Sequence, residues 1–395
     1  MPKKLIIYTS RRDIVSTSGG SSIRIEGLTK SLDDGIYSFV SQVRPKYVKE
    51  HNYFNFKLNK YELILFKIFN ISPIFVKTIL SSYIRLNKKL INLVQLIGGN
   101  FFLSHQDKTL ALILKNIFNI KIIYDIHGLS FAQELISKDD ISLKQRVINH
   151  IDIIEEKKLF NDADFLNAVS VEMKKLIVDK FNIDHRKFFI VKDGKLSLEQ
   201  KINNTRAIIE IKNKIDGRFS IGFIGNFKLM GGILNLISAY TALDKENFFF
   251  LLIGSGCLEG EITDQLDINN SHHIKRISYD ELYEYQQCVD LLICPDIQDN
   301  LYNQVCPSSL KIYDSLLSNK RVLSTYFPFW DDLKQKYPNN IYFTDSSIKD
   351  IKNKIIEISR QNVNVEKITD DFKASITYKN FSGCMIDQYK QKNIL

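Results

Sequence analysis

The feature that most constrains this fold is a regular alternation of short apolar runs with helical patterns along nearly the whole chain. A first series of runs comprises Leu5–Thr9, Tyr37–Ser41, Asn100–Leu103, Ile120–Tyr124, Phe165–Val169 and Phe188–Val191. A second series comprises Ser220–Ile224, Phe248–Ile253, His273–Ile277, Leu291–Cys294, Arg321–Ser324 and Ile341–Phe343. Continuous apolar strands separated by helices indicate parallel sheets that are covered on both faces.

The two series predict two domains. A chain of 395 residues fits two domains of ordinary size, and a polar stretch from about Glu199 to Gly217 separates the series. We therefore predict an α/β protein with two Rossmann-like, doubly wound domains, residues 1–200 and 217–377, facing each other across a cleft. A C-terminal helix at about 378–395 is expected to pack back on the first domain. Ligands of such folds bind beyond the carboxyl ends of the strands.

Composition excludes several other classes of protein. Hydrophobic residues make up 44% of the chain and charged residues 25%, which argues against a disordered or fibrous protein. The five cysteines are odd in number and share no CxxC spacing, so we expect neither a disulfide framework nor a zinc site, but a reducing compartment. The first apolar run is too short for a signal peptide, and no uncharged run is long enough to span a bilayer. We expect a cytoplasmic protein.

Three loops that follow strands are candidates for ligand binding. The first strand leads into a loop with Gly19 and Gly20 before a helix from Ile23 to Leu32, and paired glycines there let backbone amides approach an anion. His127 lies just past the end of another strand, where α/β enzymes keep reactive groups. An ordinary flexible loop and a structural histidine are the respective alternatives.

The second domain opens with the third of these loops. It contains Gly225, Asn226, Lys228, Gly231 and Gly232 and leads into a helix from Ile233 to about Leu243. Lys228 is available to a phosphate there. The spacing is not the G-x-G-x-x-G fingerprint of dinucleotide-binding proteins, so a dinucleotide ligand is disfavoured.

A later helix carries two charged residues near its start. It begins near Ser309, and Lys311 and Asp314 lie three residues apart on one face of it. A salt-bridged surface pair is the alternative to a ligand site. Asp162 and Asp164 form a D-x-D sequence in front of a strand. We interpret that pair as structural, so no metal is expected.

Taken together, these segments resemble the family-four retaining glycosyltransferases, which have the GT-B fold, over almost the whole chain. The resemblance rests on the order and spacing of Gly19-Gly20, Tyr124-Asp125-Ile126-His127-Gly128, Asp162 to Ser170, Val191-Lys192-Asp193-Gly194, Gly225 to Gly232 with Leu236 to Ala239, Leu251 to Gly256, and Ser308 to Ser324. Each motif is weak alone, but together they are specific.

The resemblance implies an enzyme that moves a sugar from a nucleotide-sugar, bound by residues 217–377, to a glycan or lipid-linked acceptor at residues 1–200. It implies no metal and no cofactor. His127 and Lys311 would be the catalytic residues. The implied donor-binding residues are Gly19, Gly20, Gly225, Asn226, Lys228, Gly231, Gly254, Ile277, Ser309, Leu310 and Asp314.

Three positions depart from the family's pattern. Asn226 and Gly231 stand where relatives carry cations for the donor diphosphate, so Lys228 or Lys311 would have to replace them. The paired glutamates of the family fall on Cys306 and Asp314, and only the second position keeps a carboxylate, the one that meets the donor ribose. These losses leave open a catalytically degenerate accessory subunit. A nucleotide-sugar epimerase is a third alternative on the same fold.

The net charge of +9 is concentrated in part in residues 57–89, where Glu62 is the only acid. The basic residues there are interleaved with aromatic and aliphatic ones, a pattern that fits an interfacial helix on anionic lipid. We therefore expect peripheral contact with the inner face of the cell membrane, with an ordinary solvated helical face as the alternative. No recognisable motif supports nucleic-acid binding.

Overall fold

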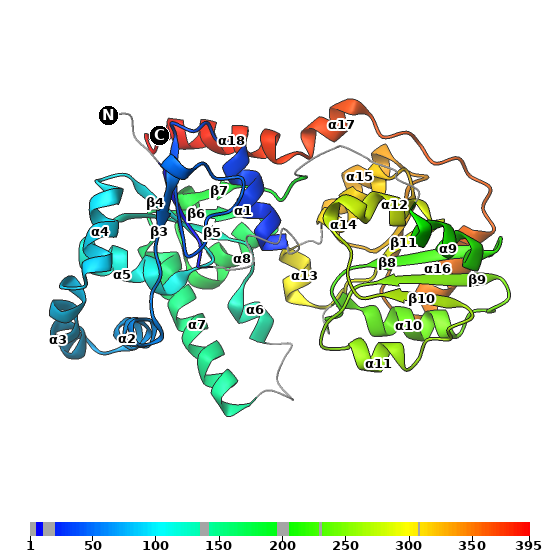
Figure 1. Ribbon diagram of the computed structural model, residues 1–395, viewed down its shortest axis with the longest axis horizontal. Helices are drawn as coiled ribbons and strands as arrows, with labels where there is room; N and C mark the ends of the chain where they lie inside the picture. Colours follow the sequence, from blue (N-terminus) through cyan, green and yellow to red (C-terminus); the bar gives the residue numbers. More distant parts are fainter. Residues whose placement is uncertain (1–4, 11–19, 135–141, 196–204, 229–230, 307–308) are drawn as a thin grey trace. The chain divides into compact units, whose positions relative to one another are not determined.

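The computed structural model describes residues 5–10, 20–134, 142–195, 205–228, 231–306 and 309–395. The chain divides into two compact units, which are described separately below (Figure 1). Unit 1 comprises residues Met1–Leu196 together with Tyr378–Leu395, and unit 2 comprises Ser197–Thr377. The second unit is therefore inserted, in sequence, within the first.

Unit 1 is built on a seven-stranded parallel sheet in the order β3-β2-β1-β4-β5-β6-β7. Its strands are β1 (Leu5–Tyr8), β2 (Tyr37–Ser41), β3 (Tyr53–Asn55), β4 (Phe101–His105), β5 (Lys121–Ile126), β6 (Phe165–Ala168) and β7 (Phe188–Ile190). The strand order reverses between β1 and β4, which is the topological switch point where doubly wound sheets place their ligands.

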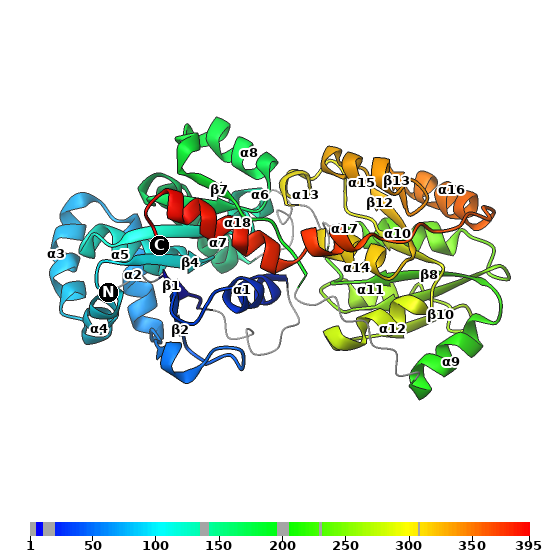
Figure 2. The same cartoon turned by 90° about the horizontal axis from the view of Figure 1, so that it is seen from above.

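Helices connect the strands of unit 1, as parallel pairing requires. They are α1 (Gly20–Lys30), α2 (Lys60–Ile71), α3 (Ile74–Arg85), α4 (Lys88–Ile97), α5 (Lys108–Phe118), α6 (Ser130–Glu134), α7 (Leu143–Asp162), α8 (Val171–Phe181) and α18 (Tyr378–Gln391). Helix α5 packs on α2 and α7, and α1 packs on α18. Figures 1 and 2 both show α18, the red helix, beside α1.

The contact between α1 and α18 depends on a glycine. A Cβ atom added at Gly27 of α1 would lie only 2.1 Å from the ring of Tyr378, the first residue of α18. The Tyr378 ring is therefore seated directly on the α1 backbone, and its side chain is buried. Only glycine leaves room for this close approach.

Unit 2 contains a six-stranded parallel sheet in the order β10-β9-β8-β11-β12-β13. Its strands are β8 (Phe219–Ile224), β9 (Phe248–Ile253), β10 (Ser271–Ile274), β11 (Leu291–Cys294), β12 (Arg321–Thr325) and β13 (Ile341–Thr344). The order again reverses in the middle, between β8 and β11, so this sheet has its own switch point.

Both faces of this second sheet are buried. In β9, Phe248, Phe250 and Leu252 join one apolar cluster with α10 and α16, while Phe249 and Leu251 join another with α9 and α12. Successive side chains of a strand point to opposite faces, which is why an uninterrupted apolar run suits this position. The helices of unit 2 are α9 (Arg206–Ile215), α10 (Ile233–Thr241), α11 (Glu259–Thr263), α12 (Leu282–Gln287), α13 (Leu301–Val305), α14 (Ser309–Leu317), α15 (Asp331–Lys336), α16 (Ile348–Ser359) and α17 (Asp370–Ser375).

The predicted doubly wound α/β class is confirmed, and each predicted strand is present to within a few residues. Two strand details were wrong: the short edge strand β3 was missed, and β10 ends at Ile274 instead of Ile277. Both are edge strands of their sheets, where polar residues are tolerated and the apolar signal is weak. The polar stretch expected to link the domains contains α9, whose Ile208 and Ile211 are buried in unit 2.

The basic and apolar segment at residues 57–89 contains two helices, α2 and α3, and the start of α4. Pro73 ends the first and caps the second, since proline cannot continue a helix. In the described part of the chain, no helix combines the length and the apolar character that crossing a bilayer needs.

We predict that Gly27→Ala destabilises unit 1. Alanine in a helix interior normally stabilises by about 1 kcal/mol relative to glycine, but here the added methyl group would displace the Tyr378 ring. Overpacking of this kind costs about 1–3 kcal/mol. Urea unfolding followed by far-UV circular dichroism should show the loss, whereas the fluorescence of Trp330, the single tryptophan of the chain, reports on unit 2.

Gly35→Ala is the matched control, because a Cβ there would meet nothing within 4 Å. If Gly27→Ala is as stable as Gly35→Ala, the α1–α18 contact does not have the geometry described.

Candidate functional site

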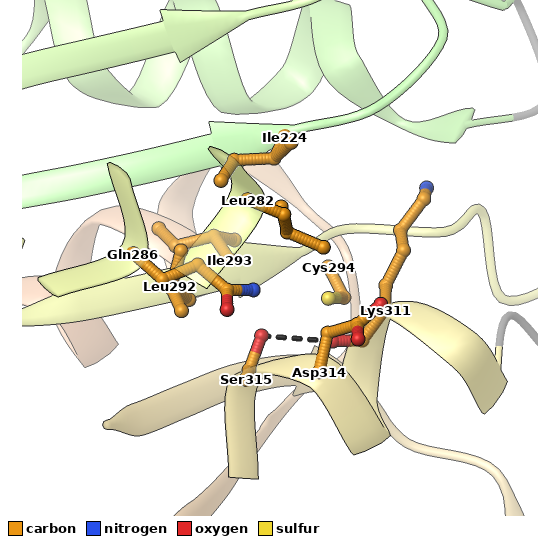
Figure 3. A pocket seen from close by; sticks show the side chains of 9 residues that line it. All are labelled: Ile224, Leu282, Gln286, Leu292, Ile293, Cys294, Lys311, Asp314 and Ser315. Carbon is orange, nitrogen blue, oxygen red and sulfur yellow. Dashed lines mark hydrogen bonds between the residues drawn. The ribbon is translucent and has the colours of Figure 1, made fainter. Parts of the chain in front are cut away.

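A pocket with an empty volume of about 340 Å³ lies at the switch point of unit 2. Ile224 and Cys294, the last residues of β8 and β11, line it together with residues of α12 and α14. Figure 3 shows Lys311, Asp314 and Ser315 together on α14, with the Lys311 side chain extended away from the other two. The remaining lining residues are Leu282, Gln286, Leu292 and Ile293.

Lys311 is held against the end of β8. Its ammonium nitrogen lies 5.4 Å from the centre of the Phe223 ring, and a Cβ atom added at Gly225 would lie 3.0 Å from its Cε atom and 3.3 Å from Nζ. Within the described part of the chain, no carboxylate forms an ion pair with it, so the predicted alternative of a salt bridge to Asp314 is wrong. A lysine in this setting presents an unneutralised charge at a strand end, where an anion can bind.

Asp314 lies one helical turn further along the same face of α14. Its Oδ1 atom accepts a hydrogen bond of 3.3 Å from the Tyr279 hydroxyl, and the residue lines the pocket beside Gln286. The Gln286 side-chain oxygen accepts a hydrogen bond from Ser318, and its side chain is buried. A fixed carboxylate and a fixed amide therefore share one pocket wall, which suits the hydroxyl groups of a polar ligand.

Glycines let the loop after β8 approach the loops after β9 and β11 closely. Gly254 has φ +147°, and a Cβ there would lie 1.8 Å from the Gly225 carbonyl oxygen. Gly232 has φ +58°, and a Cβ there would lie 1.5 Å from the Pro295 carbonyl oxygen. No other residue type fits these two positions, so the predicted glycine loops have a structural requirement that is independent of any ligand.

The two positions that lack the expected cations lie together on the loop after β8. Asn226 and Lys228 are exposed, and a Cβ added at Gly231 would meet only the Asn226 carbonyl oxygen, at 3.9 Å. The Gly231 amide donates to the Lys228 carbonyl oxygen at 3.0 Å. Space for a Cβ atom is therefore present at Gly231, which is itself buried.

The other predicted donor-binding residues are less informative. Ile277 lies beyond the end of β10, where it is partly buried against an apolar cluster that Ile224 also contacts. Ser309 and Leu310 form the start of α14, and Leu310 does not line the pocket. Gly20 begins α1 in unit 1, and Gly19 lies outside the described residues.

His127, the predicted catalytic residue of unit 1, lies beside a buried network of charged groups. Its Nδ1 atom is 3.5 Å from Asp193 Oδ2. Arg24 of α1 donates to the other oxygen of Asp193 at 2.9 Å, and it binds both oxygens of Asp125 at 2.9 and 2.7 Å. His105, the last residue of β4, contacts Asp125 through Nδ1 at 2.6 Å.

Opposing effects determine the charges in this network. Burial alone would raise the pKa of Asp125, but Arg24 and His105 more than offset it, so this pKa lies far below its ordinary value. Burial would also raise the pKa of Asp193, but His127 and Arg24 more than offset it and hold this pKa well below its ordinary value. Both carboxylates are therefore ionised at neutral pH, and Arg24 is their shared counter-ion.

A second buried acid fixes the loop that follows His127. The Glu156 carboxylate accepts hydrogen bonds from the amides of Ser130 and Phe131 at 3.1 and 3.3 Å. Lys108 donates to the Ser130 hydroxyl at 2.5 Å and lies 3.7 Å from Glu156. The histidine thus lies between two anchored segments, which restricts the positions its ring can take.

The analysis of the sequence missed Arg24, His105 and Asp193 as part of this arrangement. A signal was present, because Arg24 lies between two isoleucines and Asp125 lies inside an apolar strand, and charges in such runs are buried only when paired. Asp164 of the D-x-D sequence accepts hydrogen bonds from Lys115 and from the Ile122 amide at 2.7 and 2.8 Å. That agrees with its structural interpretation.

Comparison with solved structures identifies the architecture. The chain superposes over its whole length on Anabaena Alr3699/HepE in complex with UDP-glucose, with a TM-score of 0.61, 11% identity and 100% coverage of both chains. Sucrose-phosphate synthase from Thermosynechococcus elongatus gives a TM-score of 0.63 at 12% identity, covering 100% of this chain and 96% of that one. The fold is GT-B. At such low identity the likeness extends to the fold alone.

Among curated proteins, the uncharacterized glycosyltransferase MJ1069 of Methanocaldococcus jannaschii is 23% identical over 266 residues. The match covers 66% of this chain and 64% of that relative, just under two thirds of its length. No protein-family model matches the chain. The GT-B fold and this relative support a likeness to glycosyltransferases, which is the coarser part of the resemblance noted from the motifs.

We predict that the Arg24–Asp125 pair is strongly coupled. Arg24→Met or Asp125→Leu alone should destabilise unit 1 by about 3–5 kcal/mol, because each removes the bidentate partner of a buried charge. The double variant should lose much less than the sum of the two. Urea unfolding followed by circular dichroism measures the free energy of unfolding of the two single variants and of the double variant. Additive losses would mean that the pair is not the interaction that holds these elements together.

Arg186→Ala is the control, since Arg186 donates to Asp184 Oδ1 at 3.0 Å and to Oδ2 at 2.8 Å but is exposed. It should change the unfolding midpoint little.

Proposed function

We propose that this protein is a glycosyltransferase that transfers a sugar from a nucleoside-diphosphate sugar, bound by unit 2, to an acceptor bound by unit 1. The observation that carries the proposal is the pocket at the β8–β11 switch point, where Lys311 and Asp314 lie one turn apart on α14. Anabaena Alr3699/HepE, which shares the fold, is in complex with UDP-glucose, and this supports a UDP-sugar as the first donor to test.

Each group of the donor has a proposed partner in unit 2. The ribose hydroxyls would donate to Asp314, which the Tyr279 hydroxyl already orients. The diphosphate would lie at the close-packed glycine loops, where Lys311 and the exposed Lys228 supply positive charge. Ile277, Ser309 and Leu310 would also contact the donor, as the resemblance implies.

The proposed chemistry is electrostatic. Cleavage of the anomeric C–O bond places positive charge on the sugar and negative charge on the departing phosphate, so fixed cations accelerate the reaction by stabilising that phosphate. In the retaining mechanism that we infer, the departing phosphate accepts the proton of the acceptor hydroxyl, and no metal is required. His127, held between Asp193 and the Glu156-anchored loop, would act beside the donor sugar.

The acceptor and the location are further parts of the proposal. We infer a glycan or lipid-linked acceptor and a cytoplasmic enzyme in bacterial surface-polysaccharide assembly, on the basis of the resemblance. A second candidate, a catalytically degenerate accessory subunit, is favoured by Cys306, which stands where relatives carry an acid. Slow hydrolysis of the bound donor in the absence of acceptor would exclude that candidate.

We predict that Asp314→Ala weakens nucleotide binding by about 1–3 kcal/mol, the cost of removing a charged hydrogen-bond partner. A thermal-shift screen against UDP, GDP, CMP and dTDP compounds first identifies the nucleotide, because a specific binder raises apparent stability. Calorimetry then compares the variant with the wild type. Asp332→Ala, on an exposed position of α15 in the same unit, is the control. Unchanged affinity in Asp314→Ala would remove the ribose assignment.

We predict that Lys228 and Lys311 both bind the diphosphate of the donor. Each single alanine substitution should lower transfer and nucleotide affinity only in part. The double substitution should abolish transfer and most of the nucleotide affinity. Lys349→Ala, an exposed lysine of α16, is the control.

A gain-of-function variant makes this prediction sharper. Gly231→Lys places a cation where relatives carry one, a Cβ atom there would meet only the Asn226 carbonyl oxygen at 3.9 Å, and the variant should restore affinity to Lys228→Ala. Normal nucleotide binding by the Lys228/Lys311 double variant would show that backbone amides alone hold the phosphate, or that the donor is a monophosphate sugar.

A further inference from the structure

Helix α2 is apolar on two opposite faces. Phe66 and Phe69 are buried in unit 1, as expected for a helix that packs on α5 and α7. The opposite face carries Tyr61, Ile64, Ile68 and Ile71, whose side chains are 82%, 46%, 46% and 38% exposed. Their spacing of three, four and three residues places them in one stripe along the helix. A helix of a soluble domain ordinarily carries polar residues there.

Helix α3, which packs beside α2, repeats the pattern. Ile79, Tyr83 and the capping residue Leu86 follow one another at helical spacing and are 71%, 68% and 76% exposed, and Ile74 at the start of α3 is 84% exposed. We call the two stripes, together with Ile74 at the start of α3, the apolar face: Tyr61, Ile64, Ile68, Ile71, Ile74, Ile79, Tyr83 and Leu86. Figure 1 shows α2 and α3 as neighbours at the edge of unit 1.

This concentration is unusual for the described part of the chain. Of the 19 large hydrophobic side chains that are exposed there, nine fall between Tyr61 and Leu86. Single exposed apolar residues need no explanation, but a contiguous set of them marks a surface that another apolar phase covers.

Positively charged residues flank the apolar residues in the sequence. Lys57, Lys60, Arg85 and Lys88 are exposed and form no ion pair with the residues that the structure describes. Glu62, the only acid of the segment, is already neutralised by Lys89 at 2.8 Å. The surroundings of the apolar face therefore carry a net positive charge, and the partner must be both apolar and anionic.

We propose that this face docks on an anionic lipid bilayer. Its isoleucines, leucine and tyrosines would enter the boundary between headgroups and acyl chains, and the four basic residues would pair with lipid phosphates. A second copy of the chain fits less well, because a symmetric contact would bring the same positive charges together. Helix α2 is too short to span a bilayer, so the contact lies on the membrane surface.

The proposal extends the proposed function, since a lipid-linked acceptor would be presented at the same surface, but it does not depend on donor binding. Flotation of the purified chain, without nucleotide, with phosphatidylcholine vesicles that contain or lack phosphatidylglycerol tests it. We expect binding to the anionic vesicles only, weakened at about 0.5 M salt because screening shortens the reach of exposed charges.

Two sets of variants separate the apolar and the electrostatic contributions. Ile64→Ser/Ile79→Ser should lower partitioning roughly ten-fold, and each of Lys57→Gln and Arg85→Gln should lower it about five-fold. Ile74→Ser and Ile268→Ser form a matched pair, because both side chains are 84% exposed but Ile268 lies on a turn of unit 2. Only the first should reduce binding.

Absence of binding to anionic vesicles, or equal losses for Ile74→Ser and Ile268→Ser, would overturn the proposal. So would a concentration-dependent dimer that Ile64→Ser/Ile79→Ser dissolves, because the face would then be covered by a second copy. Nucleotide thermal shifts on the same variants keep the two proposals apart: a variant that loses vesicle binding but retains its nucleotide leaves the donor site intact.

Discussion

Unit 1 depends on the buried pair of Arg24 and Asp125. The guanidinium binds both carboxylate oxygens and also reaches Asp193 and the Val191 carbonyl oxygen. Through His105 and Asn167 the same carboxylate contacts β4 and β6. Four strand ends and α1 are thus fixed by one ion pair. Its cost in desolvation is offset only because every partner is in place, so the edge that carries His127 is rigid.

Unit 2 holds its strand ends together by a different interaction. Its strand ends approach one another through glycine, with Gly254 against the Gly225 carbonyl oxygen and Gly232 against that of Pro295. No buried ion pair neutralises Lys311 in the described residues, and its ammonium rests on the Phe223 ring. Unit 1 therefore pairs the charges of Arg24, Asp125 and Asp193 with one another, whereas unit 2 leaves the Lys311 ammonium available at the switch point of its sheet.

The features of the fold and the site that depend on local sequence patterns could be predicted from the sequence. Strands such as β9 were evident because both of their faces are apolar, and Lys311 and Asp314 were placed on one face by helical spacing alone. The Arg24 network was not predictable in this way, because its partners lie 101 and 169 residues away in the chain. The hydrogen bond from Tyr279 to Asp314 and the place of Gln286 in the pocket wall were not predictable for the same reason, because tertiary packing creates both.

The return of the chain to unit 1 has a consequence for its biosynthesis. Tyr378 and Tyr389 of α18 hydrogen bond to Asp193 and Asn167 at 3.4 and 2.9 Å, so the last helix completes the core around the buried ion pair. A ribosome delivers α18 only after all of unit 2. Domains fold as units during synthesis, and here the sequence of the second unit is complete before that of the first. During synthesis, the rest of unit 1 is therefore made long before α18. The surface of α1 around Gly27 stays uncovered until that helix leaves the ribosome.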